Sequence, residues 1–314
     1  MKIKNLIKSV GFLLGLFLIL LGLSVLLRRK GDGEVYDPYA VDRKVAQIEA
    51  ETNDTLDIFF MGDSICYSSF EPHYIWNEYG YTSFVCGTSA QRVCDTYAIL
   101  SRALETQTPK TVVLEATCFY RNMSKKSDSK DLVLDELTER FDVFAYHSEW
   151  KNIAGRICMK FSKRGPNKEK GFVGRKAVNP YRGGEYMIAT EEVDEIKPEV
   201  VEYLNKIDAL CDEKGIELIV VSVPSPRNWT YERHNAVSNW AVSADVNYLD
   251  MNIMPELDID WEVDTKDGGD HLNLAGARKV SGYIGNYIGG KVPLEDKRND
   301  EKYSDWTYYG AEDK

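Results

Sequence analysis

The stretch from Asp57 to Ser64, which reads Asp-Ile-Phe-Phe-Met-Gly-Asp-Ser, constrains the fold of this chain more than any other feature. Its four consecutive apolar residues are typical of a strand that is buried on both faces, as the strands of parallel sheets are. The run stops at Gly62, and a small hydroxyl residue follows where a helix would begin. Ligands of open α/β sheets bind just beyond the carboxyl ends of the strands, so Ser64 lies where chemistry is expected.

Comparable apolar runs recur along the chain and alternate with helical patterns. We predict strands at 56–61, 82–86, 111–116, 216–223 and 247–250. We predict helices at 72–78, from the capping-box pattern Thr88-x-x-Gln91 to Thr106, at 198–214 with Gly215 as C-cap, at 231–242 and at 274–288. Strands that alternate with helices indicate a parallel sheet, so the predicted fold class is α/β with about five strands.

The N-terminus carries an uncharged run from 9 to 27, which is long enough as a helix to cross the hydrocarbon core of a bilayer. A cleavable signal peptide would have a shorter apolar region and a small-residue cleavage site, and neither is evident. We therefore predict an uncleaved single-pass anchor in the cell membrane. Basic residues flank both of its ends and leave the orientation open. We expect the domain outside the cytoplasm, since a cytosolic enzyme would gain little from one N-terminal span.

The predicted organisation has four parts: the anchor at 1–30, a polar spacer at 31–54, an α/β domain at 55–290 and a polar tail at 291–314. Within the domain, the long charged and aromatic segment 119–197 interrupts the alternation of strands and helices. We expect this insertion to pack over the carboxyl edge of the sheet, where it could form a lid or a wall of the substrate site.

Composition excludes several classes of function. With 43% hydrophobic residues, the 314-residue chain can bury a sizeable core. Its formal net charge is −11, although the first 30 residues hold only basic groups, so the remainder is more acidic still. Such acidity disfavours nucleic acid as a partner and argues against simple electrostatic capture of an anionic wall polymer.

The six cysteines include no Cys-x-x-Cys pair, and the chain has no phosphate-binding glycine loop or dinucleotide fingerprint. We therefore expect neither a metal site nor a cofactor. Most of the cysteines are expected to be free, small and buried. One or two disulfides would fit a domain outside the cell.

Three residues could act together at the carboxyl edge of the sheet. Serine is a poor nucleophile until a base accepts its proton, so Ser64 alone could simply cap a helix. Gly87 follows the second predicted strand and could present a bare backbone N–H to a reacting carbonyl. His271 follows an acidic, glycine-rich loop and precedes the last helix. Our hypothesis is that Ser64 and His271 meet as nucleophile and base.

Gly62-Asp63-Ser64, Gly87 and the Asp270-His271-Leu272-Asn273 loop resemble blocks of the SGNH (GDSL-like) hydrolase superfamily. The resemblance is greatest to its membrane-anchored, acyltransferase-associated branch, which includes the D-alanyl-lipoteichoic acid and alginate O-acetylation proteins. It covers the order of elements from 56 to 290. It implies a three-layer αβα sandwich (flavodoxin-like SGNH fold) that hydrolyses esters or transfers acyl groups. It also implies Ser64 as nucleophile, His271 as base, and the N–H groups of Ser64 and Gly87 in the oxyanion hole.

The acid that orients the histidine departs from this pattern. It normally lies three residues before the histidine, where this chain has Gly268. Asp267 lies four residues before His271, and Asp270 lies one before it. Consecutive side chains tend to diverge, so we favour Asp267 as the orienting acid and keep Asp270 as the alternative.

The third oxyanion donor is also open. The usual Gly-x-Asn-Asp block is missing after the third strand, where Glu115-Ala116-Thr117 stands. Gln91 could donate its amide, or it could serve only as the capping-box partner of Thr88. Asn122 is a weaker candidate.

Other polar residues have a weaker connection to the site. Arg121 and Arg227 follow the third and fourth strands and could meet an anionic substrate group, although solvated or salt-bridged arginines are commoner. His73, His147 and His234 are expected to be surface residues.

The favoured function is a membrane-anchored serine esterase or O-acyltransferase (a hydrolase of GDSL type) acting outside the cytoplasm on acylated glycans or polymers of the cell envelope. A multi-span membrane O-acyltransferase is a partner that this function would fit. The alternative is a non-catalytic envelope scaffold or glycan-binding protein on the same fold. The displaced aspartate, the missing asparagine block and the aromatic-rich insertion support that alternative.

Overall fold

The computed structural model describes residues 8–20 except 10 and 13, residues 38–123 and residues 166–309. The described residues between 8 and 20 are helical, and all later ones belong to one compact unit, Tyr36–Met123 with Arg164–Lys314. Among the described residues, no helix has both the length and the apolar character needed to cross a bilayer. Residues 21–27 of the predicted anchor and 124–165 of the predicted insertion lie outside the described residues.

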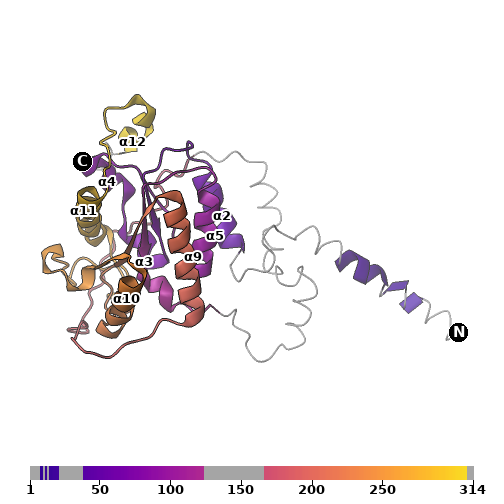
Figure 1. Ribbon diagram of the computed structural model, residues 1–314, viewed down its shortest axis with the longest axis horizontal. Helices are drawn as coiled ribbons and strands as arrows, with labels where there is room; N and C mark the ends of the chain where they lie inside the picture. Colours follow the sequence, from indigo (N-terminus) through magenta and orange to yellow (C-terminus); the bar gives the residue numbers. More distant parts are fainter. Residues whose placement is uncertain (1–7, 10, 13, 21–37, 124–165, 310–314) are drawn as a thin grey trace. The chain divides into compact units, whose positions relative to one another are not determined.

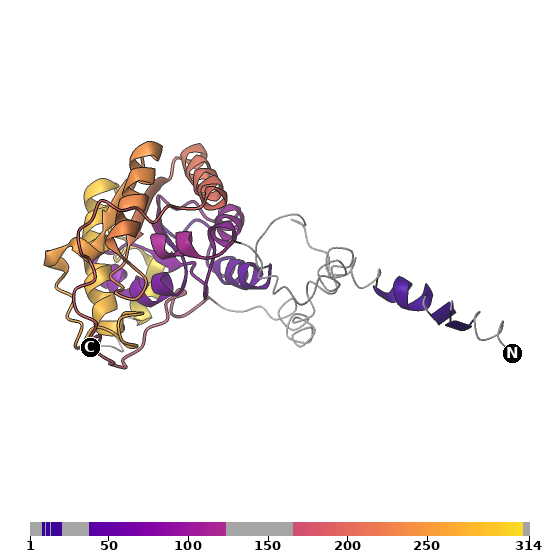
Figure 2. The same ribbon diagram turned by 90° about the horizontal axis from the view of Figure 1, so that it is seen from below.

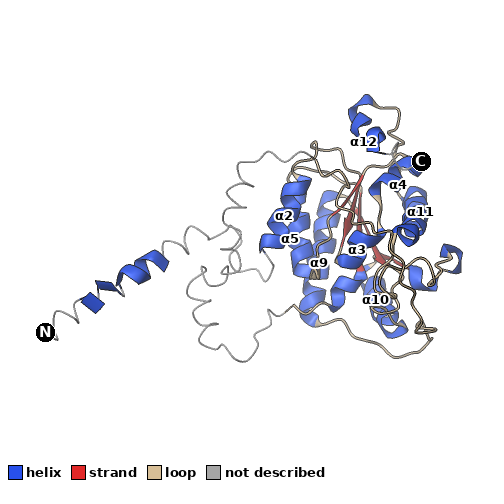
Figure 3. Cartoon of the chain, turned by 180° about the vertical axis from the view of Figure 1, so that it is seen from behind, coloured by secondary structure: helices blue, strands red, loops and turns tan. Residues whose placement is uncertain are grey.

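A five-stranded, all-parallel sheet forms the centre of the compact unit, as the sequence predicts. The strands are β1 (Ile58–Met61), β2 (Ser83–Val85), β3 (Thr111–Glu115), β4 (Glu217–Ser222) and β5 (Asn247–Asp250). Their order across the sheet is β2-β1-β3-β4-β5, and every neighbouring pair is parallel. Figure 3 shows the strands in red between helices on either side. Because all strands run in one direction, their carboxyl ends meet at one edge.

Helices cover both faces of the sheet because successive strand residues point to opposite sides. Phe59 and Met61 of β1 face a core that also includes residues of α2 (Pro38–Ile48), α5 (Val93–Ala103) and α9 (Pro198–Lys214). Ile58 and Phe60 face a second core with residues of α3 (Ser64–Ser69) and α11 (Leu274–Lys291). Figure 1 shows α2, α5 and α9 together on one side of the sheet and α11 on the other.

Most predicted boundaries agree with the structure to within a few residues. The remaining longer helices are α4 (Pro72–Tyr79) and α10 (Tyr231–Ala244). Gly215 caps α9 with a φ of +66°, as predicted. The capping box predicted at Thr88 is wrong, because α5 starts only at Val93 and its capping box joins Arg92 to Asp95. Ala90 has a φ of +51° in the preceding loop, and such a conformation cannot continue into a helix.

The part of the insertion described after the gap, residues 166–197, contains no helix or strand and is called the strap here. Residues 119 and 120, before the gap, end the short 3-10 helix Ala116–Tyr120. It appears as the rose-coloured trace in Figure 2. Its backbone hydrogen-bonds in turn to the segments that follow β1 and β5 and to the start of α10. The bonds run from Val173 N–H to Tyr67 O, Asn179 N–H to Thr265 O, Tyr181 N–H to Trp261 O and Asp194 N–H to Glu232 O. The strap therefore borders the carboxyl edge of the sheet.

The C-terminal tail packs on the domain as far as it is described. A short 3-10 helix, Glu301–Tyr303, leads into α12 (Ser304–Tyr309). Trp306 is buried with its ring centroid 5.4 Å from that of Trp76 in α4. The contact between Trp306 and Trp76 therefore buries two large aromatic side chains.

Candidate active site

The corner between β1 and α3 places Ser64 at the carboxyl edge of the sheet. Gly62 has a φ of +150°, and a Cβ atom there would lie 2.9 Å from the Cβ atoms of Cys66 and Glu115. Asp63 then caps α3, since its Oδ1 accepts a hydrogen bond of 2.9 Å from the Ile65 N–H. Ser64 is the first residue of the helix and is partly exposed. Only glycine fits the corner that directs this hydroxyl outward.

Ser64, His271 and Asp267 form one hydrogen-bonded row. His271 Nε2 lies 2.8 Å from Ser64 Oγ, and His271 Nδ1 lies 2.7 Å from Asp267 Oδ2. A carboxylate facing Nδ1 holds the proton there, which leaves Nε2 free to accept from the serine hydroxyl. The imidazole is largely buried, with 16% of its side chain exposed. The structure thus brings together three residues that the sequence analysis selected, at the separations that proton transfer needs.

A glycine turn explains how an acid four residues before the histidine can reach it. Gly268 and Gly269 have φ values of +71° and +88°, in the left-handed region that favours glycine. The chain folds back so far that Asp267 Oδ1 accepts the backbone N–H of His271 at 2.7 Å, while Oδ2 faces the ring. We call residues 267–271 the acid–base turn. Its own geometry fixes the acid against the base.

Asp270, the alternative acid, is held elsewhere. Its Oδ2 lies 3.6 Å from His271 Nδ1, which is beyond hydrogen-bond distance. Its Oδ1 accepts a bond of 2.7 Å from Asn228 Nδ2, in the loop between β4 and α10. That loop also holds the turn through Arg227, whose Nε donates to Gly268 O at 2.7 Å. Of the two candidate acids, Asp267 is therefore the one that contacts the imidazole.

Gly87 lies against the corner that carries Ser64. A Cβ atom at Gly87 would come within 2.9 Å of the backbone oxygen of Asp63 and 3.2 Å of that of Gly62. Its N–H donates no hydrogen bond in the described chain, and the N–H of Ser64 has no partner within α3 because it opens the helix. Two backbone donors are thus available beside Ser64, as an oxyanion hole requires.

The two weaker oxyanion candidates have other surroundings. Gln91 is buried; its Oε1 accepts from the Thr88 hydroxyl and its Nε2 donates to Thr96 Oγ1, both at 2.9 Å. Asn122 is exposed on the chain that leaves β3. Among the described residues, neither side chain hydrogen-bonds to Ser64 or His271.

Two buried carboxyl groups and Arg121 lie beneath the corner. The sequence analysis allowed Arg121 a salt bridge but identified neither its partner nor the burial of Glu115. Asp63 is fully buried and accepts a hydrogen bond of 2.6 Å from Arg121 Nε within a salt bridge. Glu115 is also fully buried, at the end of β3, where it accepts from the Thr117 hydroxyl at 2.7 Å. Burial, and secondly the charge of Asp63, raises the pKa of Glu115 to about 8. Glu115 is therefore protonated at neutral pH, which avoids a second buried negative charge beside Ser64.

A second histidine–aspartate pair lies at the end of β5, and the expectation that His234 is a surface residue is wrong. Only 18% of its side chain is exposed, and Nδ1 lies 2.8 Å from Asp250 Oδ2. The same carboxylate oxygen accepts from Trp229 Nε1 at 3.0 Å and from the Tyr248 hydroxyl at 3.1 Å. Asp250 thus joins α10 to β5. An aspartate at the end of a predicted strand was the one signal for it in the sequence.

Asp267, Asp270 and His271 are also the described residues whose ligand-type atoms come closest to a metal-binding arrangement, within 4.8 Å of one another. Asp267 and His271 already bind each other, and Asp270 accepts from Asn228. The five described cysteines are free and buried, and Cys158 lies outside the described residues.

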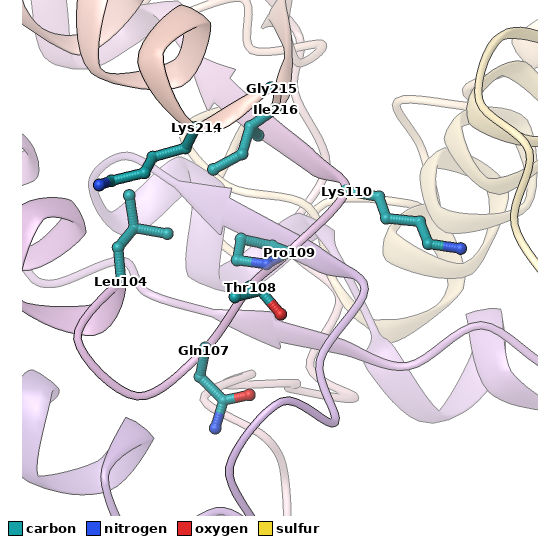
Figure 4. Close-up of a pocket in the computed structure, with 8 residues that line it drawn as sticks. All are labelled: Leu104, Gln107, Thr108, Pro109, Lys110, Lys214, Gly215 and Ile216. Carbon is teal, nitrogen blue, oxygen red and sulfur yellow. The ribbon is translucent and has the colours of Figure 1, made fainter.

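A shallow pocket of about 240 Å³ lies at the opposite, amino edge of the sheet. Figure 4 shows Leu104, Pro109, Lys214 and Ile216 around it. Its lining includes no histidine, serine or cysteine, and the Thr108 hydroxyl there donates to Asp54 Oδ1 at 2.9 Å. The candidate chemistry therefore stays at the carboxyl edge.

Comparisons with known proteins give remote similarities. A candidate acylhydrolase from Bacteroides fragilis NCTC 9343 is similar with a TM-score of 0.41 and 13% identity, over 81% of this chain and 98% of that chain. A GDSL-like lipase from Bacteroides thetaiotaomicron VPI-5482 is similar with a TM-score of 0.39 and 12% identity, over 80% and 98% of the two chains. No family model and no curated protein sequence matches.

Proposed function

We propose that this chain is a serine esterase or O-acyltransferase that works through a covalent acyl-enzyme at Ser64. One observation carries the proposal: the hydroxyl, imidazole and carboxylate of Ser64, His271 and Asp267 are joined in a row by contacts of 2.8 and 2.7 Å. Each member has the surroundings that its role requires. Ser64 is partly exposed and His271 is largely buried. Asp267 accepts a hydrogen bond from Nδ1, the ring nitrogen that does not face Ser64.

In the first half-reaction, Ser64 Oγ attacks the carbonyl carbon of the ester as its proton passes to His271 Nε2. The carbonyl oxygen becomes an oxyanion, which the N–H groups of Ser64 and Gly87 stabilise. When the carbonyl reforms, the bond to the leaving oxygen breaks, and that oxygen takes the proton from Nε2. Asp267 keeps the imidazole oriented and stabilises its charged form throughout.

In the second half-reaction, a water or an acceptor hydroxyl gives its proton to Nε2, and its oxygen attacks the acyl carbonyl. The bond between that carbon and Ser64 Oγ breaks, and Oγ recovers the proton from Nε2. Water as the attacking group gives hydrolysis, and a glycan hydroxyl gives transfer. Which of the two occurs depends on how well the site excludes water.

The setting of this chemistry rests on the sequence. The uncharged run at 9–27 supports a membrane anchor, and we propose that the domain lies outside the cytoplasm, where acylated envelope glycans or polymers would be its substrates. A multi-span membrane O-acyltransferase would fit as the partner that supplies or accepts the acyl group. The scaffold alternative loses one of its supports, because the displaced Asp267 contacts His271 despite its unusual spacing.

Hydrolysis of a series of activated and sugar acetate esters tests the proposal. The wild-type chain should cleave at least one of them, and Ser64→Ala should lose about 10³-fold or more of that rate. Exposed Ser243→Ala near the end of α10 serves as the matched control and should retain the rate. Equal rates for the wild type and Ser64→Ala would refute the proposal.

A further inference from the structure

The strap, the loop after β4 and α3 each hold the acid–base turn. Of these three, only α3 carries a reacting group. The strap accepts the Gly268 N–H on Asn179 O at 2.8 Å, and the loop after β4 donates from Arg227 Nε to Gly268 O. These contacts place the turn relative to the strap and to β4. Neither is a direct contact with α3, which carries Ser64.

Lys266 makes the third connection, directly to α3. Its Nζ donates a hydrogen bond of 2.9 Å to Ser68 Oγ, and Ser68 is buried, with 1% of its surface exposed. Ser68 lies four residues after Ser64, so it is about one helical turn away on the same face. Lys266 itself directly precedes Asp267. Among the described residues, this bond and the one between Ser64 and His271 are the side-chain hydrogen bonds that join segment 264–273 to α3.

The two bonds differ in how long they last during the proposed reaction. Once Ser64 is acylated, its Oγ has no proton to donate to His271 Nε2, so the direct bond between base and nucleophile is lost. The bond from Lys266 to Ser68 involves no reacting atom and persists. A turn with two left-handed glycines needs such a fixed point, because glycine restricts the backbone least.

We propose that Lys266 is a positioning residue, which keeps His271 over the acyl-enzyme during the second half-reaction by its bond to Ser68. This inference rests on the proposed function. It predicts a specific kinetic asymmetry. Acylation should be affected less than deacylation when the bond is removed, since the hydrogen bond from Ser64 itself orients His271 in the first step.

The test measures the two half-reactions separately with 4-nitrophenyl acetate. The release of 4-nitrophenol reports acetylation of Ser64, and the loss of the acetyl mass from the intact chain after dilution reports deacetylation. Lys266→Met and Ser68→Ala should each slow deacetylation by about 10-fold or more, a loss typical of a displaced catalytic group. Acetylation should slow by about threefold or less under the same reasoning.

Further variants separate this role from a general loss of structure. The double variant should be no slower than either single variant, because both remove the same bond. Lys266→Arg, which keeps a cationic donor, should recover part of the deacetylation rate. Lys206→Met on α9 removes an exposed cation and should change neither step. Urea midpoints identify any variant that fails to fold, and Ser68→Ala then carries the test, because it removes the bond with the smaller change.

Equal slowing of both half-reactions, or no slowing of deacetylation, would overturn the role of Lys266. If the wild type forms no acetyl adduct at Ser64, the proposed function itself fails and the inference fails with it. Acetylation of the wild type with unchanged deacetylation in both single variants would leave the proposed function standing and remove only the inference.

Discussion

Replacing Glu115 by glutamine should change how the stability of the domain depends on pH. Glu115 is fully buried at the end of β3, beneath the corner that carries Ser64, and its pKa is raised from 4.5 to about 8. The unfolded chain loses this proton near its ordinary pKa, whereas the folded chain keeps it to about pH 8. The stabilisation is therefore complete below about pH 4.5 and is lost progressively as the pH rises to about 8.

The magnitude follows from the two pKa values. Each pH unit between them costs about 1.4 kcal/mol of unfolding free energy, so the cost between about pH 5 and pH 8 is roughly 4 kcal/mol. Glutamine has nearly the same shape and does not ionise, so Glu115→Gln lacks this cost. A mismatch of the glutamine amide with the donors around it lowers the unfolding free energy by the same amount at every pH. The quantity to compare is therefore the slope of stability against pH, and not the stability at one pH.

Urea denaturation of the wild type and Glu115→Gln at several pH values between about 5 and 9 measures this slope. As the pH rises from about 5 to about 8, the unfolding free energy of Glu115→Gln should rise by roughly 4 kcal/mol relative to that of the wild type. Above about pH 8 the difference should stay constant. Exposed Glu213→Gln is the control and should show no such trend. A difference that does not vary with pH would refute the assignment of a protonated, buried Glu115.

Two further predictions concern the site. Asp267→Asn should lower kcat of ester cleavage by about 10²–10⁴-fold because the imidazole loses its orienting carboxylate, whereas Asp270→Asn should cost less than about 10-fold; the reverse order would contradict the assignment. Gly87→Ala should lower kcat/KM by about 10-fold or more and destabilise the domain by about 1–3 kcal/mol, because its Cβ would come within 2.9 Å of the Asp63 backbone oxygen. Gly290→Ala is the control, because a Cβ atom there would lie in open space. If steady-state kinetics and urea melts gave the same effects for Gly87→Ala and Gly290→Ala, the close approach of Gly87 to the Asp63 backbone would be contradicted.

The sheet could be predicted from the sequence because its signal is local. Runs such as Ile58–Met61 are apolar throughout, which marks strands buried on both faces. The signals for the bounds of the helix at 198–214 are equally local, because a proline starts it and Gly215 ends it. The start of α5 is predicted too early because Thr88 and Arg92, four residues apart, both begin capping-box patterns. The left-handed backbone of Ala90 between them has no signal in the sequence.

The site was predictable only where strand ends pointed to it. Ser64 and Gly87 follow strands directly, and His271 was selected by its loop. Asp267 is favoured over Asp270 in the sequence only because consecutive side chains diverge. The backbone of Gly268 and Gly269 and the distant partner Asn228, on which the geometry depends, leave no local signal. Contacts between residues far apart in the chain have no local signal.

The same limit applies to the contacts that support the row. Arg121 with Asp63 and Lys266 with Ser68 each join segments that lie far apart in the chain. Sequence reasoning therefore selected the members of the hydrogen-bonded row but not the residues that contact and support them.

The mass of the intact chain after a short incubation with an activated acetyl ester tests the central claim most directly. The account predicts a gain of one acetyl group that maps to the peptide containing Ser64, disappears with time, and is absent from Ser64→Ala. An unmodified chain that nevertheless cleaves the ester, or an adduct that maps to another residue and survives in Ser64→Ala, would contradict it.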